Sequence, residues 1–105
     1  MEQPTKRWII IHGTTSSPER SWFPWLAWQG LKLGVRVCVP RLPTPKNQSY
    51  KSWASAFESQ APPLLLSTVI IAHSTGVPFI LQYMQRTKQN VGKTILVSGF
   101  TEPLE

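Results

Sequence analysis

The sequence contains no aspartate, and its five glutamates stand against eleven lysines and arginines, which gives a formal net charge of +6. A basic excess of this kind can serve nucleic acid or an anionic membrane surface. The basic residues are scattered along the chain, however, and form no basic helix and no basic-aromatic stripe. We therefore predict a solvated basic surface, with no nucleic-acid or membrane partner. A second interpretation is that acidic residues belong to a missing part of the protein.

Cysteine is almost absent, because Cys38 is the only one. No disulfide can form within the chain, and the apolar run at 35–39 predicts a buried, unreactive thiol there. The N-terminus lacks the apolar core of a signal peptide, and the longest mostly apolar stretch, 61–72, is too short to cross a bilayer. Together these absences predict a soluble, cytoplasmic protein.

Short apolar runs alternate with amphipathic stretches, and the 105 residues suffice for one small domain spanning 1–105. The pattern predicts strands at 8–11, 35–39, 66–72 and 93–98, separated by helices that begin near 22, 49 and 76. This order predicts an α/β fold in three α/β/α layers around a parallel sheet of about four strands. Active sites in such sheets lie beyond the carboxyl ends of the strands. Three segments qualify: 12–17, 40–45 and 73–76.

The aromatic residues carry further expectations about the helices. Ser21 is expected to cap the first helix, and Gly34 to end it. Trp22, Trp25, Leu26 and Leu33 are expected near one face of the first helix. Trp22, Trp25 and Trp53 are expected in the core or over the sheet. The alternative for one of the tryptophans is a place in an acyl pocket.

The segment 72–76 follows a predicted strand and opens a predicted helix, as a nucleophile elbow does. Ala72 and Gly76 are small, so the backbone can turn sharply around Ser74 and expose its hydroxyl; Ala72 stands where a glycine is usual. The helix N-terminus favours negative charge beside the serine, and the Thr75 N–H is a candidate oxyanion donor. The alternative is that Ser74 is an ordinary helix-capping serine.

A second polar segment, His12-Gly13-Thr14-Thr15, follows the first predicted strand. In hydrolases with a nucleophile elbow, the second oxyanion N–H comes from a loop after a neighbouring strand. Thr14 is the first candidate for this donor and Thr15 the second. A tight polar turn without catalytic meaning is the alternative. The two motifs strengthen each other, because each lies at the carboxyl end of a strand.

With these motifs the chain resembles the small single-domain serine hydrolases related to retinoblastoma-binding protein 9, within the α/β-hydrolase superfamily. The resemblance covers nearly the whole chain, and it rests on the segments 10–13, 17–18, 22–26, 39–43, 71–76 and 96–100, and on Trp53. It implies a truncated α/β-hydrolase fold, a Ser-His-Asp enzyme acting on small esters or amides, and Ser74 as the nucleophile. It also implies that the acid and the histidine of the triad lie beyond residue 105.

A serine needs a base to take its proton, and no histidine or aspartate follows Ser74 in this sequence. His73 is expected to have a structural role, because it adjoins Ser74 on a tight turn. His12 is expected to hold the oxyanion loop by hydrogen bonds, since no carboxylate is evident to orient it as a base. Neither histidine has a partner at metal-ligand spacing, so we predict no metal and no other cofactor.

Two functions remain open at this point. The first is a serine hydrolase half-domain that cleaves small esters through an acyl-serine, once a missing carboxyl-terminal part completes it. The second is a catalytically inactive interaction module that retains the hydrolase half-fold. In either case the predicted strand at 93–98 offers an open sheet edge, through which the chain can self-associate.

Overall fold

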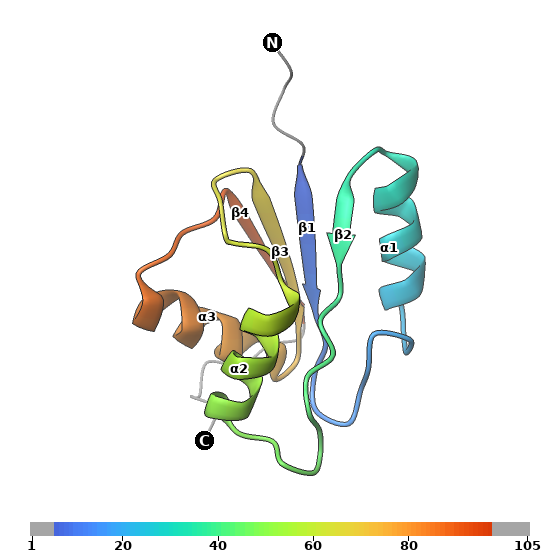
Figure 1. Ribbon diagram of the computed structural model, residues 1–105. Coiled ribbons are helices and arrows are strands. Elements are labelled where there is room, and N and C mark those ends of the chain that lie inside the picture. Colours follow the sequence, from blue (N-terminus) through green and yellow to red (C-terminus); the bar gives the residue numbers. More distant parts are fainter. Residues whose placement is uncertain (1–5, 98–105) are drawn as a thin grey trace.

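The computed structural model describes residues 6–97, in which strands and helices alternate as the sequence predicts (Figure 1). The elements are β1 (Arg7–Ile11), α1 (Phe23–Lys32), β2 (Arg36–Cys38), α2 (Tyr50–Gln60), β3 (Thr68–His73), α3 (Gly76–Thr87) and β4 (Lys93–Val97). Within this part of the chain the strands form one parallel sheet in the order β2-β1-β3-β4. The predicted α/β architecture is therefore confirmed.

The strand register brings the polar motifs together. Ile11 at the end of β1 pairs with Ala72 of β3, and His73 pairs with Val97 of β4. Parallel strands that end in register place the residues after them at one edge of the sheet. The loop that begins at His12 therefore starts beside the turn that follows β3.

The sheet has two faces that are covered unequally. Alternate residues of β1 point to opposite sides: Ile9 and Ile11 belong to a large buried cluster with Trp53 and Phe79 from α2 and α3. Ile10 points the other way, into a smaller cluster with Phe23 of α1. Helices α2 and α3 lie together, whereas α1 lies apart, beside β2 (Figure 1).

Helix α1 differs from its prediction. Ser21 does not cap it, because Ser21 has a left-handed φ of 58°; Trp22 stands at the cap position without a side-chain cap. Trp25 is 64% exposed, so its expected place in the core or over the sheet is wrong, and Leu33, expected on the same helix face, is 72% exposed. The stripe that packs on the sheet side consists of Phe23, Leu26, Ala27 and Gly30, at helical spacing. Gly34, with a φ of 78°, ends the helix as expected.

The other boundaries need smaller corrections. Ser49 caps α2 and accepts a hydrogen bond from the Ser52 N–H at 3.0 Å. β3 begins at Thr68 rather than 66, because the Thr68 N–H and hydroxyl close a turn onto Leu65. The Cys38 thiol is half-buried rather than buried, and burial raises its pKa. No helix in the described range is long and apolar enough to cross a membrane.

Candidate active site

Ser74 lies on the sharp turn between β3 and α3. β3 ends at His73 and α3 begins at Gly76, and Ser74 between them has a φ of 55°. A non-glycine residue in this region is strained by roughly 1–2 kcal/mol, and such residues cluster at functional sites. The turn is held on both sides: the Ser74 N–H donates to the Val97 carbonyl, and the Val77 N–H donates to the Ser74 carbonyl, each at 3.0 Å. Ser74 is therefore outside any regular helix.

Two glycines allow β1 to approach this turn. A Cβ on Gly13 would stand 2.9 Å from the Ser74 Cβ, so the loop after β1 runs directly beside the serine. A Cβ on Gly76 would stand 2.9 Å from the carbonyl oxygens of both Ile11 and His12. Any side chain at either position would force these segments apart. The absence of a side chain thus sets the distance between the two motifs.

Thr14 and Thr75 are joined by hydrogen bonds across the gap between the two motifs. The Thr14 N–H donates to the Thr75 Oγ1 at 2.6 Å, and the two threonine hydroxyl oxygens are 2.8 Å apart. The Thr75 N–H is among the first donors of α3, and within residues 6–97 it has no hydrogen-bond acceptor. Of the two predicted oxyanion donors, the Thr75 N–H is free within the described part of the chain, whereas the Thr14 N–H is engaged by the Thr75 side chain.

A second loop continues this network. Gln48 donates from Nε2 to the Thr14 Oγ1 at 2.8 Å and accepts from the Thr44 hydroxyl at 2.6 Å. The Thr44 Oγ1 in turn accepts from the Thr15 N–H at 2.8 Å. We call Thr14, Thr15, Thr44, Gln48 and Thr75 the threonine latch. Sequence reasoning missed Thr44 and Gln48; Thr44 lies within the segment 40–45, and Gln48 lies in the loop that continues beyond it.

His12 is fully buried, and both of its ring nitrogens are engaged. Nδ1 lies 2.8 Å from the Gly13 carbonyl, and Nε2 accepts the Leu42 N–H at 3.0 Å. Because Nε2 is an acceptor, the ring is neutral and carries its proton on Nδ1. Burial lowers the pKa of His12 below 6.5, which favours the same neutral form. His12 therefore ties the loop after β1 to the loop after β2.

His73 faces away from the threonine latch. Its ring packs edge-on against Trp22 and Phe23, with centroid distances of 5.6 and 5.9 Å. Within residues 6–97, no histidine and no carboxylate forms a hydrogen bond with the Ser74 hydroxyl. Glu19 is paired with Arg41, and Glu58 accepts a hydrogen bond from Tyr83. The described part of the chain thus contains a sharp turn at Ser74 and two candidate oxyanion donors, and none of its histidines or carboxylates bonds to Ser74 as a base would.

No group of three metal-ligating side chains occurs within the described range. The two histidines are held separately, one by backbone groups and one by aromatic rings. The chemistry available at this site is nucleophilic attack by a serine beside backbone N–H donors.

Known proteins are similar to this chain in sequence and in fold. The YdeN protein of Bacillus subtilis (strain 168) is 34% identical over 102 residues, which are 95% of this chain and 54% of YdeN. The crystal structure of the ydeN gene product superimposes with a TM-score of 0.81 over 91% of this chain and 53% of that one. An extracellular α/β-hydrolase from a Paenibacillus species has a TM-score of 0.71 at 16% identity, over 92% of this chain and 42% of its own.

The last of these similarities supports the α/β-hydrolase fold alone, whereas the first also reflects common descent. The chain spans about half the length of the curated relative that it matches, 54% of YdeN. The family model described as serine hydrolase matches residues 8–104, well over half of the sequence. On this evidence the chain belongs to the serine hydrolase family.

Proposed function

We propose that this chain carries the nucleophile and the oxyanion hole of a hydrolase that cleaves small carboxylic esters through an acyl-serine. The observation that carries the proposal is the left-handed Ser74, with a φ of 55°, beside Gly13 at the end of β1. In this reaction a base takes the Ser74 proton as Oγ bonds to the carbonyl carbon, and the alcohol leaves with that proton. Water then hydrolyses the acyl-serine and releases the acid. The base and the acid of the triad come from polypeptide other than residues 6–97.

The Thr75 and Thr14 N–H groups are the proposed oxyanion donors. Thr75 meets this role directly, because its N–H has no acceptor within the described part. The Thr14 N–H is held by the Thr75 Oγ1, so the Thr75 side chain must rotate away before Thr14 can donate to an oxyanion. The exchange is favourable, since a hydrogen bond to an anion is about twice as strong as one between neutral groups.

Without a base the isolated chain should turn over very slowly. Loss of triad members typically reduces turnover by about 10⁴- to 10⁶-fold. We also propose that the chain is related to the small hydrolases similar to retinoblastoma-binding protein 9. We propose a cytoplasmic location as well. The coding DNA beyond residue 105 tests where the acid and the base of the triad originate. Codons for an aspartate and a later histidine in the same frame would supply both groups.

A fluorophosphonate probe tests the nucleophile itself. We expect slow labelling of Ser74, located by mass spectrometry and accelerated by added imidazole, which substitutes for the missing base. Ser74→Ala should abolish the labelling, whereas Ser67→Ala, which removes a serine hydroxyl elsewhere, should leave it unchanged. A folded chain that stays unlabelled with imidazole would contradict the proposal.

The inactive interaction module remains the second candidate. It is favoured by one observation: within residues 6–97 β4 is an edge strand, and its residues Ile95 and Leu96 are 44% and 46% exposed. An exposed, apolar edge invites pairing with another chain. A chain that folds cooperatively and ignores the probe, yet binds a protein partner through β4, would identify this function.

A further inference from the structure

A polar pocket of about 430 Å³ lies between the loop after β1 and the loop after β2. Its lining comes from the segments 15–20 and 41–45, which hydrogen bonds hold side by side past the carboxyl ends of these two strands (Figure 1). Every polar side chain among the described lining residues carries a hydroxyl or a guanidinium group, and none carries a carboxylate. These residues are Thr15, Ser16, Ser17, Arg20, Arg41 and Thr44. Such a set of donors suits an anion.

The charges around the pocket leave one cation without a partner. Arg41 is paired with Glu19, and the Arg41 guanidinium lowers the pKa of that carboxyl, so Glu19 stays ionised and keeps Arg41 occupied. Arg20 forms no ion pair within residues 6–97. Together the three groups carry a single positive charge, which a monoanion such as a carboxylate would balance. A phosphate dianion would exceed it.

One hydroxyl of the same pocket is also unengaged. The Ser16 N–H donates to the Gly13 carbonyl at 3.3 Å, but the Ser16 hydroxyl has no hydrogen bond within the described part of the chain. The threonine hydroxyls beside it are occupied, because Thr15 donates to the Thr14 carbonyl and Thr44 donates to Gln48. The Ser16 hydroxyl can therefore join the Arg20 guanidinium in binding an anion.

The pocket opens next to the proposed nucleophile. Gly13 lies against Ser74, since a Cβ on Gly13 would stand 2.9 Å from the Ser74 Cβ, and Thr15, two residues later, lines the pocket. Two extended residues span about 7 Å, the length of roughly six single bonds. Thr15 is fixed there by a left-handed φ of 58° and by its N–H, which donates to the Thr44 Oγ1 at 2.8 Å. An ester at Ser74 would reach the pocket with an arm of this length.

We propose that this pocket selects esters that carry a carboxylate about six bonds from the reacting carbonyl, and that Arg20 and the Ser16 hydroxyl bind this carboxylate. The guanidinium fork can donate two parallel N–H bonds to a carboxylate, and the Ser16 hydroxyl adds another. The bound carboxylate takes no part in the reaction and only holds the carbonyl carbon at Ser74. The inference rests on the proposed function, because selection among esters requires that Ser74 attacks them.

Binding without reaction tests the pocket separately from the chemistry. Monomethyl adipate, whose carboxylate oxygens lie about six bonds from the ester carbonyl carbon, is titrated into the Ser74→Ala chain, and the backbone amide resonances are followed by NMR. Methyl hexanoate is the uncharged ester of the same length. We expect monomethyl adipate alone to shift the amides of Ser16, Arg20 and Thr44. About 0.5 M NaCl should reduce the shifts, because salt screens exposed charges.

Two variants and a matched control locate the binding. Arg20→Gln should raise the Kd of monomethyl adipate by about three- to fivefold, near the upper limit for an exposed ion pair. Ser16→Ala should raise it less, since it removes one hydrogen bond and no charge. Arg36→Gln is the control: Arg36 is exposed at the start of β2, at the other end of the strand, and does not line the pocket. It should leave the Kd unchanged.

The results distinguish failure of the pocket from failure of the proposed function. Equal binding of the two esters, equal effects of Arg20→Gln and Arg36→Gln, or tighter binding of inorganic phosphate would overturn the inference. Fluorophosphonate labelling of Ser74 in a chain that does not bind monomethyl adipate would keep the nucleophile and overturn the pocket. Binding to a chain whose Ser74 is never labelled would refute the hydrolase function and leave the carboxylate site standing.

Discussion

Replacement of Ser74 by glycine should make the chain more stable, although it removes the proposed nucleophile. The left-handed region costs an L-residue roughly 1–2 kcal/mol, and Ser74 has a φ of 55°. Glycine escapes this cost but loses more freedom on folding, by about 0.5–1 kcal/mol. The hydroxyl has no hydrogen bond within residues 6–97 that would be lost. We expect Ser74→Gly to raise the free energy of unfolding by about 0.5–1 kcal/mol, from the difference between the two costs.

Urea denaturation measures this difference against an alanine variant. Ser74→Ala keeps the strained φ and should match the natural chain, whereas Ser74→Gly should unfold at a higher urea concentration. With a slope near 1 kcal/mol per molar urea, the midpoint should rise by about 0.5–1 M. Ser67, which has no positive φ, provides the control position, where glycine should be less stable than alanine. If Ser74→Gly is no more stable than Ser74→Ala, the backbone at residue 74 is unstrained and the elbow argument fails.

Three further predictions concern the surroundings of the elbow. Gly76→Ala should lower the free energy of unfolding by about 1–3 kcal/mol, measured by urea denaturation, because the added Cβ would meet two carbonyl oxygens at 2.9 Å. Thr75→Val should lower the free energy of unfolding by about 0.5–1.5 kcal/mol, because the half-buried Thr14 N–H loses its acceptor; faster hydrogen exchange of the Thr14 amide should accompany it, and Thr75→Ser should restore both. The pKa of His12 is lowered below 6.5, so the unfolded chain binds its proton more readily. The contribution of His12 to stability is therefore complete above pH 6.5 and declines as the pH falls below it. His12→Gln should flatten this part of the stability profile, and an unchanged slope would show that His12 is not its source.

The order of the elements could be predicted because apolar runs and amphipathic stretches alternate in the sequence. The errors fall where a local pattern competes with a tertiary contact. Trp25 lies within the apolar run that begins at Trp22, yet it is 64% exposed. The reason is that α1 turns the stripe of Phe23 and Gly30 toward the sheet instead. Gly30 decides this choice: a Cβ there would meet Val37 at 2.7 Å, so this helix face lies closest to the strands.

The elbow could be predicted for a different reason, because its residue types follow from steric needs. A sharp strand-to-helix turn requires small neighbours, and Gly13 and Gly76 are the positions where a Cβ would collide. The latch partners Thr44 and Gln48 gave no such signal. They reach Thr15 and Thr14 from 29 and 34 residues away, and polar loop residues carry no periodicity that would show this contact.

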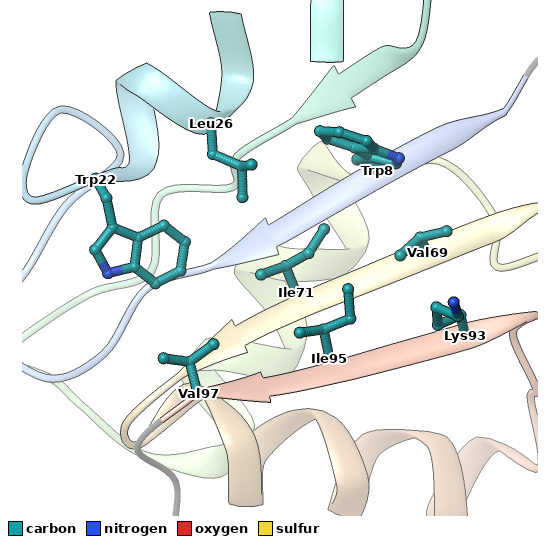
Figure 2. Close-up of a pocket in the computed structure, with 8 residues that line it drawn as sticks. All are labelled: Trp8, Trp22, Leu26, Val69, Ile71, Lys93, Ile95 and Val97. Atoms are coloured by element: carbon teal, nitrogen blue, oxygen red, sulfur yellow. The ribbon is translucent and has the colours of Figure 1, made fainter. Parts of the chain in front are cut away.

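A backbone hydrogen bond joins the elbow to the edge strand β4. The Ser74 N–H donates to the Val97 carbonyl, and the Val97 side chain lines the apolar pocket on the α1 side of the sheet (Figure 2). β4 is an edge strand of the described sheet, so its position has support from β3 on one side only. The elbow therefore depends on the pairing of β3 with β4, because this pairing holds the carbonyl that accepts from Ser74.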